Sequence, residues 1–375
     1  MEAMRWTQGV TFPPERPLLN LSQAAPVGAP PLALREELAR LVMDDVSVHL
    51  YGPDLGFPAL REQVAQDWSR DYAGDISADQ VAITSGCNQA FCGAIAALAK
   101  AGDAVILPTP YYFNHAMQLQ TVGVEARLSP CRANMVPDIE HVASLIDGAV
   151  KAIVLVTPNN PTGAEYPEGV IQAFYDLAKR HGLPLILDET YRDFRASDER
   201  PHKLFEDPDW ADTLIHLYSF SKTYRLTGHR VGAMIASASL LAEVEKYIDS
   251  VTICANQLGQ RAALFGLRNL GDWVASERLE ILRRKAAVEA AFARIEGSRI
   301  LSVGAYFAFV EHGFDMPSDV LAERLVKEQS LLVLPATMFT PASDDVGNRC
   351  LRVAFANADL DGIAEFAQRW RAFTP

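Results

Sequence analysis

Short apolar segments of strand length recur along the middle of the chain and alternate with longer amphipathic segments. The apolar segments are residues 81–84, 104–107, 151–156, 185–187, 214–218 and 231–236. Amphipathic segments of helical period, at residues 88–100, 168–181 and 240–250, lie between several of them. This alternation is typical of βαβ units, in which helices cover both faces of a mostly parallel sheet. The pattern therefore predicts an α/β fold over roughly residues 50–270.

The two ends of the chain follow a different pattern. Six prolines between residues 13 and 31 predict an extended arm, because proline fixes φ and cannot donate a backbone hydrogen bond. Beyond Trp273, a long helical segment precedes strand-like residues 306–310 and 350–355 and a helix over 318–329. We expect an arm and part of a small domain over residues 1–48, a large domain over 49–270 and a small α+β domain over 271–375.

Charge and cysteine content exclude several classes of protein. The 375 residues include 34 Lys and Arg against 47 Asp and Glu, a net charge of -13 that repels nucleic-acid phosphates and anionic lipids. No uninterrupted apolar stretch approaches the roughly 18 residues of a membrane span, and the N-terminus lacks a signal-like apolar region. The five cysteines form no CxxC pair, so neither a disulfide framework nor a metal site is expected. A cytoplasmic protein without nucleic-acid or membrane partners is predicted.

Polar, chemistry-bearing residues directly follow the apolar segments. Ligands of open α/β sheets bind outside the carboxyl ends of the strands, so these residues are candidates for a site. Residues 86–88 open a helix, whose free N–H groups and dipole favour a phosphate. Ser219, Ser221 and Arg230 add two hydroxyl donors and a guanidinium fork. These positions predict a phosphate-binding end of the site.

Asp188 and Lys222 supply the remaining chemistry. A carboxylate such as Asp188 can keep a pyridine nitrogen protonated, and an amine such as that of Lys222 can form a Schiff base. Each residue alone has an ordinary structural explanation, as a turn residue or a solvated lysine. Their joint placement at strand ends has none. Together they predict a site for a phosphorylated aromatic cofactor held as an imine.

The motifs resemble those of the class I/II aminotransferases, in the aspartate-aminotransferase-like branch of the fold type I pyridoxal-phosphate (PLP) enzymes. They occur in the family order with family-like spacing, and the similarity spans about residues 19–355. The resemblance implies PLP as the cofactor. It also implies a mostly parallel seven-stranded sheet in the large domain and a smaller α+β domain built from both chain ends.

The resemblance assigns roles residue by residue. Lys222 matches the Schiff-base lysine that also moves the substrate α-proton, Asp188 matches the partner of the pyridine nitrogen, and Tyr191 matches a donor to the ring hydroxyl oxygen. These three are the predicted catalytic residues. The predicted cofactor-binding set is Gly86, Cys87, Asn88, Tyr112, Asn160, Asp188, Tyr191, Ser219, Ser221, Lys222, Arg230 and Tyr51 of the partner subunit. A homodimer with shared active sites is therefore expected, with no metal.

Three residues match substrate-binding positions. Arg352 matches the arginine that binds the substrate α-carboxylate, and Asn160 is expected to touch the same group. Ala24 stands where the family often has glycine, which leaves its contact with the carboxylate open. Residues 249–256 lack the second arginine of dicarboxylate-specific relatives, so a neutral or aromatic substrate is favoured. Arg5 or Arg16 could still reach the pocket in place of that arginine.

The predicted function is a ping-pong exchange of an amino group between an L-amino acid and a 2-oxo acid. A lyase on the same fold, either a C–S β-lyase or an enzyme like aminocyclopropane-carboxylate synthase, remains the alternative. The absence of GxGxxG after a strand and of GxxxxGK[ST] disfavours a nicotinamide dehydrogenase and a P-loop NTPase. A second hypothesis for Cys87, at a helix N-terminus, is a reactive low-pKa thiol.

Overall fold

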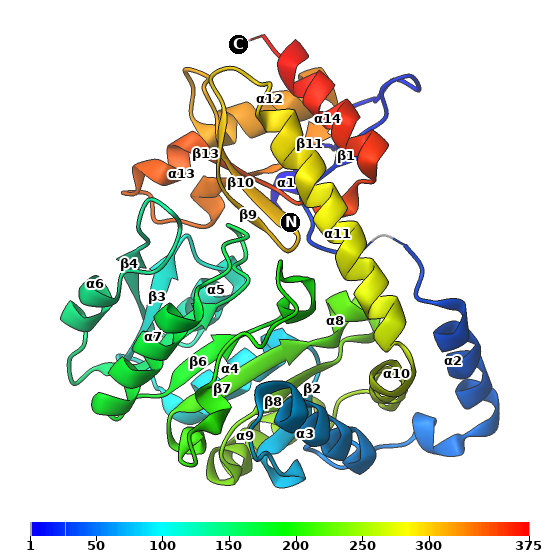
Figure 1. Ribbon diagram of the computed structural model, residues 1–375, viewed down its shortest axis with the longest axis vertical. Coiled ribbons are helices and arrows are strands. Elements are labelled where there is room, and N and C mark those ends of the chain that lie inside the picture. Colours follow the sequence, from blue (N-terminus) through cyan, green and yellow to red (C-terminus); the bar gives the residue numbers. More distant parts are fainter. Residues whose placement is uncertain (1, 27, 375) are drawn as a thin grey trace.

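A seven-stranded sheet forms the centre of the computed structural model, which describes residues 2–26 and 28–374 (Figure 1). The strand order is β2-β8-β7-β6-β5-β3-β4, and only β8 runs antiparallel to its neighbours. The strands are β2 (Val81–Thr84), β3 (Ala104–Thr109), β4 (Glu125–Pro130), β5 (Val150–Val156), β6 (Leu185–Asp188), β7 (Leu214–Ser219) and β8 (Gly232–Ile235). The prediction of a mostly parallel seven-stranded sheet is confirmed.

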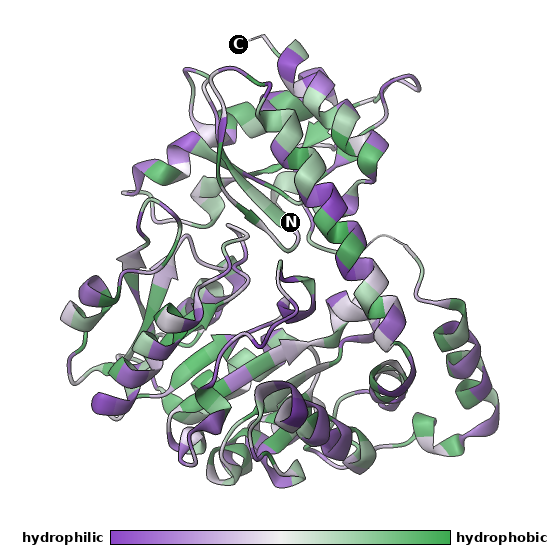
Figure 2. Cartoon of the chain, viewed as in Figure 1, coloured by the Kyte–Doolittle hydropathy of each residue, from purple (hydrophilic) through white to green (hydrophobic). Residues whose placement is uncertain are grey.

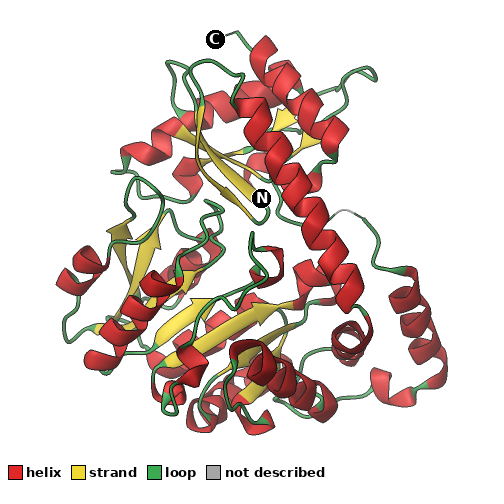
Figure 3. Cartoon of the chain, viewed as in Figure 1, coloured by secondary structure: helices red, strands yellow, loops and turns green. Residues whose placement is uncertain are grey.

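Helices cover both faces of this sheet (Figure 3). One layer contains α4 (Cys87–Leu98), α5 (Phe113–Thr121) and α9 (Ala238–Thr252), and the other contains α3 (Pro58–Tyr72), α6 (Ile139–Ser144), α7 (Glu168–Arg180) and α10 (Gln257–Asn269). Side chains of a strand alternate between the layers. In β6, Leu185 and Leu187 pack with the α3 layer, whereas Ile186 packs with the α4 layer. Figure 2 shows the resulting contrast between apolar strands and mixed helices.

Strand β4 was not predicted from the sequence. It lies at the edge of the sheet and pairs only with β3 among the described strands. Its residues are mostly half-exposed, and it carries Glu125 and Arg127 instead of an apolar run. Charged side chains are common on edge strands because they discourage pairing with another chain. Periodicity alone therefore gave no strand signal here.

A smaller α+β unit packs above the carboxyl ends of the large sheet (Figure 1). Its antiparallel sheet has the order β12-β13-β10-β9. The elements are β9 (Arg299–Gly304), β10 (Phe307–Glu311), β12 (Leu334–Pro335), β13 (Cys350–Val353), α11 (Gly271–Phe292), α12 (Ser318–Gln329), α13 (Asp345–Arg349) and α14 (Leu360–Ala372). Strand β1 (Leu19–Asn20) of the arm pairs with β11 (Leu331–Leu332), so both chain ends build this unit, as predicted.

The first residues form a short helix that the sequence did not reveal, α1 (Glu2–Arg5). Four residues are too few to show a helical period. Ala3 of α1 is buried against an apolar cluster that includes Leu334 and Phe339. Helix α2 (Leu32–Asp44) instead packs on α10 of the large unit. The exact domain boundaries stay a prediction.

Shorter helical segments complete the chain. They are α8 (Phe220–Thr223) and the 3₁₀ helices η1 (Val46–His49), η2 (Ala78–Gln80), η3 (Arg192–Phe194), η4 (Leu204–Glu206), η5 (Trp210–Asp212), η6 (Thr227–His229), η7 (Ala336–Met338) and η8 (Phe355–Asn357). Within the described residues, no helix has both the length and the apolarity that crossing a membrane requires.

Candidate active site

A pocket of about 390 Å³ lies at the carboxyl ends of the parallel strands, between the two units. It is the place where most of the predicted site residues meet. Those lining it are Ala24, Cys87, Asn88, Tyr112, Asn160, Asp188, Tyr191, Ser219, Ser221, Lys222, Arg230 and Arg352. Gly86 directly precedes Cys87 at the pocket edge. Tyr51 is not among the lining residues of its own chain, which leaves a role in a neighbouring copy untested.

Lys222 lies on α8, directly after β7, and points into the pocket. Its Nζ donates a hydrogen bond to the backbone carbonyl of Ala24. Burial lowers the pKa of Lys222 to about 8, and the positive charges of Arg230 and Arg352 act in the same direction. An appreciable fraction of this lysine is therefore an uncharged, nucleophilic amine near neutral pH.

Asp188 ends β6 and is buried, which raises its pKa above the ordinary value. Thr190 N donates to its Oδ1 at 2.9 Å, and His115 Nε2 lies 3.7 Å from Oδ2. Burial lowers the pKa of His115 to about 3, so this imidazole is neutral and forms no ion pair with Asp188. The carboxylate therefore faces the pocket with capacity for a protonated ligand nitrogen.

His115 was missed in the sequence, although a signal existed. It lies three residues after Tyr112, the N-cap residue of α5, so the helical spacing places the two side chains on the same side. Their rings meet edge to face with centroids 5.1 Å apart, and His115 stacks on Phe91 at 3.9 Å. Tyr112 therefore lines the pocket, and His115 is buried behind it beside Asp188.

Donors converge at the N-terminus of α4. Gly86 is its N-cap residue with a φ of 83°, and a Cβ there would collide with the guanidinium of Arg230. Arg230 Nη1 lies 3.4 Å from Ser221 Oγ, and Ser219 Oγ accepts from Ser221 N at 3.3 Å. A helix N-terminus, two hydroxyls and a cation together make a site for an anion such as phosphate.

Cys87, the first residue of α4, is a protonated thiol in this setting. Burial raises the pKa of the Cys87 thiol well above its ordinary value, and the nearby charge of Asp188 acts in the same direction. Both effects oppose the thiolate that a helix N-terminus would favour. The surroundings of Cys87 therefore give no support to a reactive thiolate.

Arg352, on β13, forms the opposite end of the pocket. Its Nη1 donates to Asn160 Oδ1 at 2.8 Å, and its Nη2 donates to the backbone carbonyl of Ser22. The guanidinium lies between the rings of Phe307 and Phe339, with its carbon 4.9 and 4.8 Å from their centroids. Its Nε is buried and has no hydrogen-bond partner in the described part of the chain.

The charge on Arg352 calls for an anion. Burial lowers its pKa to about 10, so it remains cationic at neutral pH. Among the described residues no carboxylate pairs with it, and an unpaired buried cation is costly. A ligand carboxylate that bridges two guanidinium nitrogens would satisfy both the charge and the free donor.

Two tyrosines border the space between Asp188 and Arg352. Burial raises the pKa of Tyr191 well above its ordinary value, and the same effect raises the pKa of Tyr112 to about 12. Both phenols therefore keep their protons and act as hydrogen-bond donors at neutral pH. Tyr112 OH donates to Asn88 Oδ1 at 3.4 Å, which directs its ring along the pocket wall.

Part of the pocket wall is apolar. Ala3 and Met4 of α1, Leu334 and Phe113 line it, and the first three were not predicted from the sequence. The aromatic residues Phe12 and Tyr111 do not line the pocket; they pack into apolar clusters instead. The described arginines at positions 5 and 16 do not reach it either. The wall next to the predicted substrate side chain is therefore mainly apolar.

Comparisons with known proteins identify the class. A family model described as aminotransferase class I and II matches residues 16–369. The chain belongs to this family, and the protein is an aminotransferase. It is 30% identical over 328 residues to an aspartate aminotransferase of Thermotoga maritima, a match that covers 86% of this chain and 84% of the relative.

Other relatives carry different substrate names. An aromatic aminotransferase of Arabidopsis thaliana is 31% identical over 281 residues, covering 73% of this chain and 69% of its own. A methionine aminotransferase of Escherichia coli is 27% identical and covers 98% of this chain and 95% of its own. The solved structure of an Escherichia coli protein with methionine aminotransferase function gives a TM-score of 0.89 at 24% identity, covering 100% of this chain and 97% of that chain. This likeness confirms the fold.

Proposed function

We propose that the protein is a PLP-dependent aminotransferase that moves an amino group between an L-amino acid and a 2-oxo acid by a ping-pong mechanism. When bound, PLP would hold the amino group covalently and act as a sink for the electrons left by the α-proton. One observation carries this proposal. A single pocket holds a buried amine of lowered pKa, a carboxylate without a cationic partner and a guanidinium with a free donor, at Lys222, Asp188 and Arg352.

The donor set fits this cofactor. Asp188 would hold the ring nitrogen in its protonated form, Tyr191 and Asn160 would donate to the ring hydroxyl oxygen, and the ring of Tyr112 would stack on the cofactor face. The phosphate would be held by the backbone of Gly86, Cys87 and Asn88 and by the side chains of Ser219, Ser221 and Arg230. The positive φ of Gly86 and the close approach of the Arg230 guanidinium support this assignment, because they bring a cation against the first turn of α4.

Lys222 would perform the proton transfer. Its lowered pKa, about 8, leaves it uncharged often enough to remove the α-proton of a bound amino acid at Nζ. The positive charges of Arg230 and Arg352 make the resulting ammonium acidic, so that Lys222 also gives the proton up again. The same residue would thus serve as base and acid in each half-reaction.

Arg352 would bind the α-carboxylate of both substrates. Asn160 Oδ1 already fixes one end of the guanidinium, and the side-chain amide would also face the bound carboxylate. Ala24 lines the same region with its backbone carbonyl next to Lys222 Nζ. We infer that this carbonyl orients the amine of Lys222. Because position 24 is alanine and not glycine, we infer that Arg352 and Asn160 alone contact the substrate carboxylate.

The pocket favours a neutral or aromatic substrate side chain over a dicarboxylic one. The charged lining residues in the described part of the chain are Asp188, Lys222, Arg230 and Arg352, and each has a role toward the cofactor or the α-carboxylate. A second carboxylate would therefore meet the apolar wall of α1, and burying it there without a partner is costly. Met4 suits an irregular apolar side chain because its thioether is flexible and polarisable.

Exposed apolar side chains support a homodimer. Met43 and Tyr51 are 81% and 79% exposed, and Val46 and Leu50 between them are also exposed. Monomeric proteins rarely gather such residues in one segment. We infer that this segment packs on a second copy in the cytoplasm, where Tyr51 of the partner subunit would reach the phosphate end of the site.

A single-substrate experiment tests the function. The protein is reconstituted with PLP and mixed with one amino acid at a time, without a 2-oxo acid, while visible absorbance is recorded and small products are identified. Transamination predicts one equivalent of 2-oxo acid per site, no ammonia or thiol, and recovery of the absorbance when a 2-oxo acid is added. Continued release of ammonia or thiol would establish a lyase, and a protein without visible absorbance would refute the cofactor assignment.

A further inference from the structure

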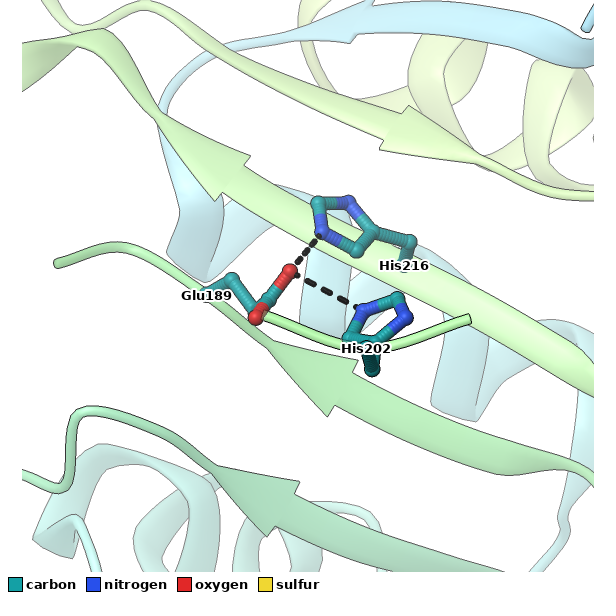
Figure 4. Close-up of side chains that lie close together, drawn as sticks. All are labelled: Glu189, His202 and His216. Carbon is teal, nitrogen blue, oxygen red and sulfur yellow. Dashed lines mark hydrogen bonds and ion pairs between the residues drawn. The ribbon is translucent and has the colours of Figure 1, made fainter. Parts of the chain in front are cut away.

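Glu189, the residue after Asp188, forms a buried cluster with His202 and His216 (Figure 4). Glu189 Oε2 accepts from His216 Nε2 at 2.7 Å and from His202 Nε2 at 3.3 Å. Tyr72 OH, from α3, donates to the same oxygen. All four side chains are fully buried. The proposed reaction uses none of them directly.

The hydrogen bonds fix the protonation states of the two histidines. Trp68 Nε1 donates to His216 Nδ1 at 3.4 Å, and the backbone N of Leu204 donates to His202 Nδ1 at 3.3 Å. An indole or amide nitrogen can only donate, so each Nδ1 carries no proton. Each ring is therefore neutral with its proton on Nε2, and burial lowers the pKa of His216 in agreement.

Glu189 is consequently an ionised carboxylate that accepts three hydrogen bonds. Tyr72, His202 and His216 all direct their protons at Glu189 Oε2, which is the arrangement expected around an ionised carboxylate. Glu189, His202 and His216 are close enough to hold a metal ion. Such an ion would need the lone pairs of both Nε2 atoms, and in this arrangement those atoms carry the protons.

The strand geometry couples Glu189 to the active site. Asp188 and Glu189 are consecutive, so their side chains point to opposite faces. Asp188 lies on the face of Ile186 and enters the pocket, whereas Glu189 lies on the face of Leu185 and Leu187. The backbone is held from both sides: Thr157 N donates to Asp188 O at 3.0 Å, and Glu189 N donates to Leu217 O at 2.9 Å.

Among the described residues no lysine or arginine pairs with Glu189; its two ion-pair contacts are with His202 and His216, which carry charge only when protonated. The guanidinium of Arg192 lies over the rings of Trp68 and Tyr72 and pairs with Asp71 at 2.5 Å. Two separate sets of titratable and charged groups surround the two carboxylates. Those around Glu189 are Tyr72, His202, His216, Arg192 and Asp193. Those around Asp188 are Cys87, Tyr112, His115, Tyr191 and Lys222. The field of Glu189 therefore reaches Asp188 without a neutralising ion pair.

We propose that Glu189 is a positioning residue of the aminotransferase site, which acts through Asp188. Its carboxylate, fixed by three donors, anchors the end of β6 and maintains a permanent negative charge behind Asp188. Asp188 therefore binds a protonated ring nitrogen more tightly than it would alone. The proposal rests on the proposed function, because that nitrogen belongs to the proposed cofactor.

Two variants separate the charge from the packing. Glu189→Gln removes the charge but keeps an oxygen acceptor for the histidines, whereas Tyr72→Phe removes one hydrogen bond and keeps the charge. The readout is the apparent pKa of the visible absorbance of the PLP-loaded protein, obtained from a pH titration. Thermal unfolding of both variants measures the structural cost alone.

The expected shift follows from Coulomb's law. At an effective dielectric constant of about 20, a unit charge about 10 to 15 Å from the titrating group corresponds to roughly 1 pH unit. Glu189→Gln should lower the apparent pKa by about that amount, because losing a negative charge weakens proton binding nearby. Tyr72→Phe should leave it within about 0.3 units. An unshifted Glu189→Gln titration, or equal shifts in both variants, would overturn the positioning role.

A measurement on the unmodified holoenzyme covers the case in which Glu189→Gln does not fold. Nitrogen-15 NMR of labelled histidines should show His202 and His216 as Nε2–H tautomers at neutral pH, as the hydrogen bonds to their Nδ1 atoms require. Protonated rings, or Nδ1–H tautomers that free Nε2 for a metal ion, would overturn the proposal. Absence of visible absorbance in the unmodified protein would instead refute the proposed function itself.

Discussion

Replacing Arg352 by alanine should selectively remove affinity for the α-carboxylate. In the structure this guanidinium is fully buried between two phenylalanine rings, stays charged because its pKa is about 10, and has one donor without a partner. A substrate carboxylate would complete the hydrogen bonds of this guanidinium. Arg352→Ala therefore removes one partner of a desolvated charge pair.

The expected loss is large. Truncating one member of a buried, hydrogen-bonded charge pair costs about 2 to 5 kcal/mol, and each 1.4 kcal/mol is a factor of ten in affinity. The dissociation constant of an amino acid should therefore rise by roughly 30-fold to 5,000-fold. Arg352→Lys should recover only part of it, because an ammonium cannot form the bidentate pair.

The assay is an absorbance titration of the PLP-loaded protein with an amino acid and, in parallel, with the matching amine that lacks a carboxylate. The amine should bind the variant and the unmodified protein with similar affinity, since it does not use Arg352. Unchanged amino acid affinity in Arg352→Ala would refute the reasoning and move the carboxylate site elsewhere. An equal loss for both ligands would show general damage to the pocket.

Three substitutions and one pH dependence test other parts of the site. Lys222→Ala should abolish turnover and the visible absorbance of bound PLP while the protein stays folded; retained turnover would reject the assignment. In the unmodified apoprotein, the rate of PLP attachment should rise about tenfold per pH unit up to about pH 8 and level off above it, because burial lowers the pKa of Lys222 to about 8 and only the neutral amine reacts. Asp188→Asn should slow exchange of the substrate α-proton far more than it weakens substrate binding, and a pure binding defect would contradict the role of Asp188. Met4→Arg should place a cation on the apolar wall and raise the affinity for dicarboxylic amino acids relative to aromatic ones, whereas an unaltered preference would show that α1 does not contact the substrate side chain.

The fold was largely predictable because its strands carry a strong signal. Strands buried on both faces need uninterrupted apolar residues, and these runs stand out between amphipathic helices. The edge strand β4, with Glu125 and Arg127, follows no such rule. Helix α1 was hidden because its burial depends on Leu334 and Phe339, more than three hundred residues away in the sequence.

Some features of the site could be predicted from the sequence and others could not. Asp188 and Lys222 follow strands, where topology alone brings side chains to one edge of the sheet. Their protonation states could not be predicted, because these depend on burial and on Arg230 and Arg352. The sequence left open whether Cys87 is reactive, because the burial that raises the pKa of its thiol depends on tertiary packing. The contacts made by α1 and by Glu189 could not be predicted either, because they too depend on tertiary packing.

The most direct test of the central claim follows the amino group itself. The PLP-loaded protein is given an amino acid labelled with nitrogen-15, the small molecules are removed, and an unlabelled 2-oxo acid is then added. The account predicts that about one label per active site stays with the protein-bound cofactor and then appears in the new amino acid. Label released as ammonia, with none passed to the 2-oxo acid, would contradict amino transfer at this site.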